Sequence, residues 1–433
     1  MEDRLYYPED SIPLRRLIPM GMQHVVAMFG ATVLAPVLMG FNPQTAVFFS
    51  GVGTLIFIAI TRFKVPSYLG SSFAFIGPVL AVTGGRPEGI PAALCGIAGA
   101  ALLYALAAAY TMKRGSGWID RLMPPVVTGS VVALIGLNLA GSAVQNSVNA
   151  DFVLATRHDY IVFGVAAFTF LASAAVSIYA RGFLRLLPIL TGVVAGCVLS
   201  AWLGLISPES WAAVVDAPWL GLPPFRSPIF SLPALLVIAP VFVVLVAENK
   251  GHIEAIGGYM KRDLNPHLGR AYMGDAVASF VSAMGGGTPQ TTYAENMGVM
   301  AITRVFSVYN FVAAACMAVL LGLCPKFGAL IQSIPAPVLG GVTLILYGLI
   351  ALMGVKIWLD AKVDFCSHKN LIIAGASIIA ATGLGVKGIT VAGVNIAGIA
   401  FGTVLAVVLN LLLSFGGGDR PQDKCGAVTQ TRI

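Results

Sequence analysis

Three ionisable side chains stand where the chain is otherwise apolar. Glu248 and His252 follow the apolar run Ala239–Val246, and their spacing of four residues puts both on one face of a helix. Glu295 lies in Gly285–Arg304, a stretch too polar for a membrane span and too apolar for a surface loop. Carboxylates at membrane depth are costly and usually functional. We therefore expect Glu248 and Glu295 to accept hydrogen bonds from one ligand, and Glu248 with His252 to handle a proton.

Proton exchange suits this pair because burial disfavours the charged form of both side chains. Such a pair can couple a substrate to a proton gradient. Lys250 leaves two outcomes open: it extends to the cytoplasmic surface, or it reaches Glu248, keeps that carboxylate ionised and weakens the coupling argument. Plainer alternatives are a helix-end pair facing water for Glu248 and His252, and a carboxylate stabilised only by the helix dipole for Glu295.

The polar stretch has a counterpart earlier in the chain. Ser71-Ser72-Phe73-Ala74-Phe75 aligns with Thr291-Thr292-Tyr293-Ala294-Glu295, a separation of 220 residues. Interrupted hydrophobic segments at corresponding positions of two halves indicate a transporter's binding site. The residue types predict short strands over Ser71–Phe75 and Thr291–Tyr293. Half-helices that start there would leave the amides of Phe73 and Ala294 free for a ligand.

These groups together predict a flat, neutral ligand with alternating N–H and C=O groups. Phe73, Tyr293 and Tyr347 are candidates to pack on its faces, although simple core packing is an equal alternative for an aromatic. Gln23-His24 form another polar pair at membrane depth. Either an interhelical hydrogen bond or substrate contact would explain them, and we place Gln23, His24 and Asn296 behind the residues that touch the ligand.

The composition is that of a membrane protein. Of 433 residues, 57% are hydrophobic and 10% charged, against about 25% charged in soluble domains. The fold class is therefore an all-α integral membrane protein, with the first span retained because the N-terminus is polar. Runs near the length that crosses the hydrocarbon core predict fourteen spans: Leu17–Met39, Thr45–Ile60, Tyr68–Val82 (broken), Ile90–Tyr110, Pro124–Ser142, Tyr160–Tyr179, Leu186–Leu205, Leu232–Ala247, Met273–Met284, the broken segment around Tyr293, Phe306–Leu323, Val338–Met353, Leu371–Ala381 and Gly393–Leu413.

The two sets of seven spans resemble each other. Pro125-Val-Val-Thr-Gly129 with Gly136 matches Pro337-Val-Leu-Gly-Gly341 with Gly348, at an offset of 212. Because seven is odd, the second set enters the membrane from the opposite side, which predicts an inverted repeat. Spans three and ten are the broken ones.

The distribution of charge tests this topology. With the N-terminus inside, 20 of the 26 Lys and Arg fall in cytoplasmic segments, and Lys250 ends a span. A positive-inside bias supports this orientation, with both termini cytoplasmic. It also explains the net charge of +7 better than nucleic-acid binding does. The five that fall outside are Arg86, Arg157, Arg226, Lys326 and Lys387.

Other chemistries have little support in the sequence. The six cysteines, which include Cys316, Cys366 and Cys425, show no Cys-x-x-Cys spacing, so we expect small buried hydrophobes and neither disulfides nor a metal site. No nucleophile with its base and no phosphate loop is visible, so we expect no enzyme and no cofactor beyond a coupling proton. With no appended soluble domain indicated, residues 1–433 form one membrane unit.

These motifs resemble a known family. Glu295-Asn-Met-Gly298-Val-Met-Ala-Ile-Thr303-Arg304 is similar to the signature of the nucleobase–ascorbate transporters, also called nucleobase:cation symporter family 2. Gln23-His24 resembles that family's first-span motif. The resemblance covers nearly the whole chain and is strongest to bacterial uracil and pyrimidine permeases.

The resemblance implies a mechanism and an architecture. It implies a core domain of about residues 17–113 and 231–325, a gate domain of about 121–205 and 330–415, a rocking or elevator-like movement between them, and dimers through the gate domain. The expected protein is a proton-coupled importer of uracil or a related pyrimidine in the cytoplasmic, or inner, membrane. Site roles carried over by the resemblance are acceptors Glu248 and Glu295, amide donors Phe73 and Ala294, a proton-coupling His252, and pocket residues Ala31, Tyr293 and Tyr347.

Two departures from the family pattern matter. Ala294 stands where several uracil permeases have Gly, and Lys250 where an apolar residue is common. Purine members usually carry Gln at the position of Glu295, which favours the pyrimidine branch over a xanthine or urate carrier. An anion carrier of the same architecture is a further alternative, but it would require a cationic site at the helix ends. A membrane enzyme or receptor is another, and it would bind uracil without transporting it.

Overall fold

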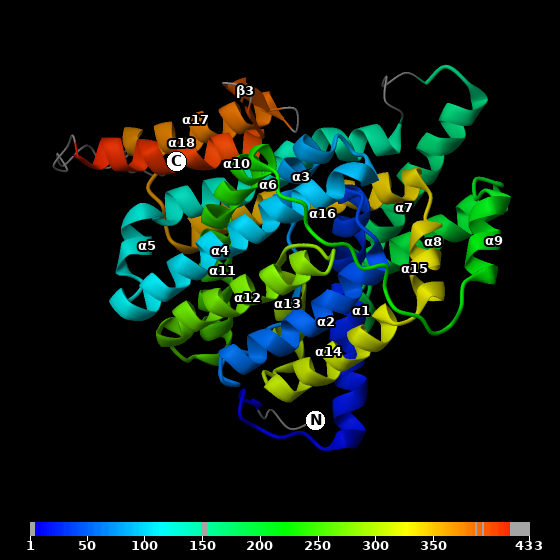
Figure 1. Ribbon diagram of the computed structural model, residues 1–433, viewed down its shortest axis with the longest axis horizontal. Coiled ribbons are helices and arrows are strands. Elements are labelled where there is room, and N and C mark those ends of the chain that lie inside the picture. The colour runs from blue at the N-terminus through cyan, green and yellow to red at the C-terminus, as the bar shows by residue number, and fades with distance from the viewer. Residues whose placement is uncertain (1–4, 149–153, 386–387, 392–393, 416–433) are drawn as a thin grey trace, which may run out of the picture.

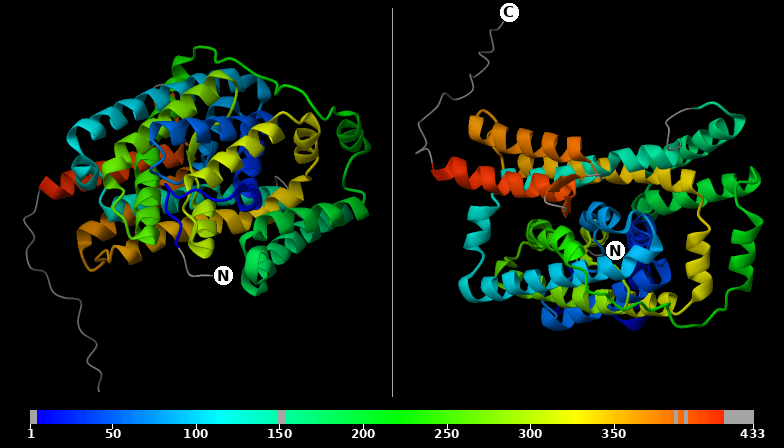
Figure 2. Two further views of the ribbon diagram at one scale, coloured as in Figure 1. Left: turned by 90° about the horizontal axis from the view of Figure 1, so that it is seen from below. Right: turned by 45° about the horizontal axis from the view of Figure 1, so that its top comes forward.

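Two layers of helices make up the molecule. The computed structural model describes residues 5–148, 154–385, 388–391 and 394–415, and Figure 2 shows the layers edge-on, joined by short helices at opposite edges. The first layer contains α1 (Leu14–Met39), α2 (Pro43–Ile60), α3 (Ile76–Thr83), α4 (Ile90–Arg114), α10 (Leu232–Ile238), α11 (Phe242–Met260), α12 (Leu268–Met284), α13 (Ala294–Thr303) and α14 (Val308–Gly322).

The second layer is built from later parts of each half of the chain (Figure 1). Its most extensive contact joins α6 and α16, and α7 also packs on α16. The layer contains α6 (Pro125–Ser147), α7 (Arg157–Tyr179), α8 (Pro188–Trp202), α16 (Ala336–Asp360), α17 (His368–Leu384) and α18 (Gly398–Phe415). Its connectors to the first layer are α5 (Gly117–Leu122), α9 (Pro208–Asp216) and α15 (Pro325–Gln332).

Small residues allow α6 and α16 to approach closely. A Cβ added at Gly136 would lie 2.3 Å from the carbonyl oxygen of Tyr347, and one at Gly354 would lie 2.4 Å from the backbone of Gly129 and Ala133. Close backbone contact through small residues is the usual basis of helix association in membranes. The glycines of the Pro125–Gly129 region thus pack this layer.

Seven described helices are long and apolar enough to cross a membrane, or eight if the bent pair α14 and α15 is one span. The bend in that pair is 81°. Three shorter apolar helices, Phe73–Thr83, Pro188–Trp202 and Gly398–Ser414, add to these. A multi-pass, mainly helical membrane protein follows, since only helices and closed barrels satisfy the backbone within lipid.

The two interrupted segments meet in the middle of the first layer. Strand β1 (Leu69–Ser71) pairs antiparallel with β2 (Gln290–Thr292), with Gly70 opposite Thr291. The strands lie earlier than predicted, and Phe73–Phe75 is the 3-10 helix η1 instead of strand. The reason is a contact from α2: the hydroxyl of Thr54 accepts from the Leu69 amide at 2.9 Å, and that of Ser50 donates to the Leu69 carbonyl at 2.8 Å.

The connections and the C-terminal region contain further local structure. The connection Ser207–Ser227 contains helix α9, capped by the Ser207 hydroxyl. The last span was predicted to begin at Gly393, which lies outside the described residues; a hairpin precedes α18. The remaining elements are strands β3 (Ile389–Val391) and β4 (Val394–Ile396), and 3-10 helices η2 (Pro87–Gly89), η3 (Gly182–Leu186), η4 (Ala239–Val241) and η5 (Asn265–His267).

The prediction that the cysteines are buried is wrong for Cys316 and Cys366, which are exposed. Cys316 lies on the apolar outer face of α14, where exposure of its side chain to lipid carries no cost. Cys425 and Lys387 lie outside the described residues.

Candidate functional site

A cavity of about 480 Å³ lies between the two layers. Its walls come from η1, α11, β2 and α13 of the first layer and from α6 and α16 of the second. It reaches the surface at the exposed residues Lys356 and Asp360, near the end of α16. The volume falls within the range of about 300–1,000 Å³ typical of small-molecule sites.

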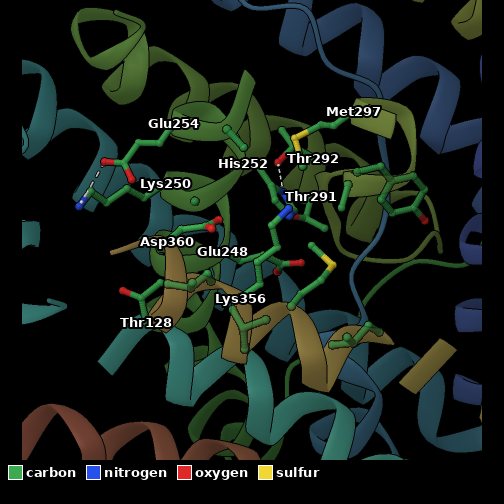
Figure 3. Close-up of a pocket in the computed structure, with 18 of the residues that line it drawn as sticks. Thr128, Glu248, Lys250, His252, Glu254, Thr291, Thr292, Met297, Lys356 and Asp360 are labelled. Atoms are coloured by element: carbon green, nitrogen blue, oxygen red, sulfur yellow. Dashed lines mark hydrogen bonds and ion pairs between the residues drawn. The ribbon is translucent and has the colours of Figure 1, made fainter. Parts of the chain in front are cut away.

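Glu248 and His252 both line this cavity from α11. Figure 3 shows them close together. The Oε2 atom of Glu248 is buried and meets no hydrogen-bond partner in the described part of the chain. His252 is engaged, because its Nδ1 lies 2.8 Å from the Thr292 hydroxyl of β2. The histidine is therefore held in place, whereas the carboxylate has an oxygen left for a ligand or a proton.

Glu295 enters the same cavity from the first turn of α13. The amides of Phe73 and Ala294 open η1 and α13, where helical geometry supplies no acceptor. Within the described residues neither amide has a hydrogen-bond partner. The strand pair thus directs two helix starts, with two free donors, at a space that also holds two carboxylates.

The aromatic candidates lie differently from one another. Tyr293 lines the cavity, but its hydroxyl is occupied: it donates to the Ser71 carbonyl at 3.2 Å and accepts from the Thr32 hydroxyl at 3.3 Å. Phe73 also lines it, with Tyr347 edge-on at 6.4 Å between ring centroids. Tyr347 itself is not among the lining residues, so its contact with the cavity runs through Phe73.

The remaining candidates lie behind the wall. Ala31 is 1% exposed in α1 and does not line the cavity. On the same helix, the His24 ring packs against Phe311 at 4.4 Å between centroids, and Asn296 lies beside it. Gln23 is half-buried and likewise outside the lining.

Comparison of the sequence with known proteins shows the family of the chain. A model described as "Permease family" matches residues 15–389. "Putative pyrimidine permease RutG" of Escherichia coli (strain K12) is 45% identical, with 95% of this chain and 93% of that protein covered. The "Uracil permease" of Bacillus caldolyticus is 40% identical, with 94% of each covered. The chain belongs to the nucleobase–ascorbate transporter family of permeases.

Solved structures share the fold of this permease. The transmembrane domain of the cyanobacterium bicarbonate transporter BicA superimposes with a TM-score of 0.60 at 16% identity, covering 92% of this chain and 98% of that one. A structure of SLC26A9 superimposes with a TM-score of 0.63 at 11% identity, covering 93% of this chain and 65% of that one. At such identities the likeness concerns the fold alone. As the sequence predicts, the permease is a transporter and not an enzyme.

Lys250 does not pair with Glu248, so the predicted alternative in which it keeps that carboxylate ionised is wrong. Its ammonium group forms ion pairs with Asp120 of α5 and, at 3.4 Å, with Glu254 one turn further along α11. Figure 3 shows Lys250 beside Glu254, turned away from Glu248. The presence of a lysine here therefore leaves the proton argument for Glu248 intact.

One buried carboxyl group of the permease, Asp275, is not among the predicted site residues. Asp275 on α12 is fully buried and accepts a hydrogen bond from the side-chain amide of Asn249, which also donates to the Tyr104 hydroxyl at 3.1 Å. The signal was available, since Asp275 lies inside the predicted span Met273–Met284. Thr291 and Thr292, which the sequence predicts only as strand residues, also line the cavity.

Proposed function

We propose that the permease imports uracil or a related pyrimidine base together with protons. The observation that carries this proposal is the pairing, in one cavity, of two carboxylates with two free backbone amides. The names of the relatives, a pyrimidine permease and a uracil permease, agree with it.

The proposed recognition uses the hydrogen-bonding edge of the base. Uracil presents ring N–H donors and carbonyl acceptors in one plane. Glu248 and Glu295 accept from the N–H groups, and the amides of Phe73 and Ala294 donate to the carbonyl oxygens. A base that lacks a matching group leaves a buried polar atom unpaired at a cost of about 1–3 kcal/mol.

Coupling is assigned to Glu248 with His252. A free carboxylate oxygen faces the cavity, while the imidazole is oriented by its bond to Thr292. A proton on Glu248 neutralises the charge that the moving site would otherwise carry through an apolar environment, where an unpaired charge is expensive. Release of the proton on the inner side then frees the base.

The transport movement is proposed to occur between the two layers. We assign the first layer to a core domain of about residues 17–113 and 231–325, and the second to a gate domain of about 121–205 and 330–415. Fourteen spans in two inverted repeats, an inner-membrane location, a cytoplasmic N-terminus and a gate-mediated homodimer complete the proposal. The predicted cytoplasmic C-terminus lies outside the described residues.

The test is uptake of labelled uracil into proteoliposomes under an imposed inward proton gradient. Wild type should accumulate uracil, and a proton ionophore should collapse the accumulation. Glu248→Gln should abolish it, whereas Glu209→Gln, the same change at an exposed site on α9, should not. Accumulation that ignores both the gradient and Glu248→Gln would refute the coupling mechanism.

Competition separates the rival substrates in the same assay. Excess thymine or uracil should inhibit uptake, and xanthine, urate or bicarbonate should not. Inhibition by xanthine or urate in preference to pyrimidines would reassign the permease to the purine branch.

A further inference from the structure

A second hollow lies at the edge where α5 joins the two layers. This groove encloses about 510 Å³ between the end of α4, the short helix α5 and the outer part of α18. Figure 2 (right) shows α5 crossing from one layer to the other beside the end of α18. Six of the residues that line the groove are Tyr110, Arg114, Trp118, Arg121, Leu122 and Leu411.

Two positively charged side chains line this groove. Arg114 is the last residue of α4 and Arg121 lies in α5, and both are exposed. Across the described residues neither guanidinium group has an ion-pair or hydrogen-bond partner. The nearby carboxylate of Asp120 is already bound to Lys250, at the mouth of the main cavity. The groove is therefore left with the charge that an anion would balance.

The rest of the lining is aromatic and aliphatic. The rings of Tyr110 and Trp118 meet edge to face at 5.6 Å between centroids, and the indole N–H donates to the Thr111 hydroxyl at 3.2 Å. These contacts hold both rings at the groove. Leu122 and Leu411 supply the apolar part of its lining. A free inorganic anion needs the arginines alone, whereas a phospholipid would use the arginines and the apolar wall together.

The position along the span fits a headgroup. The candidate span Pro87–Arg114 ends at Arg114, so the groove lies where hydrocarbon gives way to the polar interface. Trp and Tyr concentrate at that depth. In the orientation proposed above this is the cytoplasmic face, where anionic lipids attract basic residues and basic pockets between spans bind their headgroups.

We propose that this groove binds an anionic phospholipid, with Arg114 and Arg121 on the phosphate and Leu122 and Leu411 against an acyl chain. The bound lipid steadies α5, which is the connection between the layers on this edge. Asp120 of α5 also holds Lys250 at the cavity mouth. Lipid bound at this groove therefore acts on the segment that connects the two moving layers. The site takes no part in binding the base.

The test measures lipid binding to the full-length purified permease. Detergent-solubilised protein is titrated with phosphatidylglycerol, with phosphatidylcholine of the same acyl chains, and with inorganic phosphate, and bound lipid is counted by native mass spectrometry. Wild type should prefer phosphatidylglycerol, and Arg114→Gln/Arg121→Gln should weaken its binding about tenfold or more, given about 1 kcal/mol per basic residue near the surface.

Two further variants make the outcome decisive. Arg15→Gln/Lys113→Gln removes two exposed positive charges that do not line the groove and should leave the preference unchanged. Arg114→Lys/Arg121→Lys keeps both charges and should retain most of the preference, which shows that the loss is not one of folding. Equal binding of the two lipids by wild type, or an equal loss in the Arg15→Gln/Lys113→Gln control, would overturn the proposal. Full displacement of lipid by inorganic phosphate would replace it with a site for a soluble anion.

Discussion

A single methyl group at Gly70 should test whether the strand pair positions the ligand-binding amide. The Cβ of Gly70→Ala would lie 2.4 Å from Cε2 and Cζ of Tyr293 and 2.5 Å from its hydroxyl oxygen. Since carbon atoms pack at about 3.5 Å, the ring must move by about 1 Å. Tyr293 is 3% exposed and directly precedes the Ala294 amide at the start of α13, so the displacement is transmitted to that donor.

The expected loss of folding stability in Gly70→Ala has two parts. Overpacking a filled core typically costs about 1–3 kcal/mol. Displacing the Tyr293 hydroxyl weakens its bonds to Ser71 and Thr32, worth about 1 kcal/mol each. The same displacement moves the Ala294 amide away from the ligand and weakens a hydrogen bond worth about 1 kcal/mol. Binding of uracil to purified Gly70→Ala should therefore weaken about five- to tenfold, because about 1.4 kcal/mol corresponds to a factor of ten.

The assay is a scintillation-proximity measurement of uracil affinity, paired with the melting temperature. Gly348→Ala is the control, since a Cβ there meets no atom within 4 Å. In a Tyr293→Leu background the added methyl at Gly70 should cost much less, which a double-mutant cycle isolates. A Gly70→Ala protein that is less stable but binds uracil with unchanged affinity would refute the claim that β1 positions Ala294.

Three further changes probe the surrounding structure. Thr292→Val keeps the strand but removes the oxygen bonded to His252, so proton-driven uracil accumulation should fall several-fold with binding retained; an unchanged pH profile of uptake would contradict this. Asp275→Ala removes one of the two acceptors of the buried Asn249 amide and should lower stability by about 1–3 kcal/mol, whereas Asp275→Asn should lower it less. A melting temperature of Asp275→Ala equal to that of wild type would argue against a structural role. The hydrogen bond from Arg262 lowers the pKa of Glu9, so the pair stabilises the fold above the ordinary carboxyl pKa and loses this contribution as pH falls through the lowered value. Glu9→Gln should therefore reduce the free energy of unfolding at neutral pH by at most about 1 kcal/mol, because the pair is exposed. Its melting temperature should lie slightly below that of wild type at neutral pH, and the difference should disappear in acid.

Features encoded over short stretches of the chain could be predicted. Hydropathy identifies the membrane class because crossing a bilayer requires a run of fixed length. The spacing of Glu248 and His252 places both on one helical face, and the structure puts both in one cavity. The interruptions at Phe73 and Ala294 are visible as polar, glycine-rich breaks, and helices begin at both residues.

Contacts between distant segments were decided only by the tertiary structure. The register that sets Gly70 opposite Thr291 depends on hydroxyls of α2, and the choice of Lys250 between partners depends on where α5 brings Asp120. The groove with Arg114 and Leu411 joins residues about 300 positions apart. Such pairings leave no periodic signal in the sequence, because they are fixed by how whole helices pack and by which side chains that packing leaves within reach.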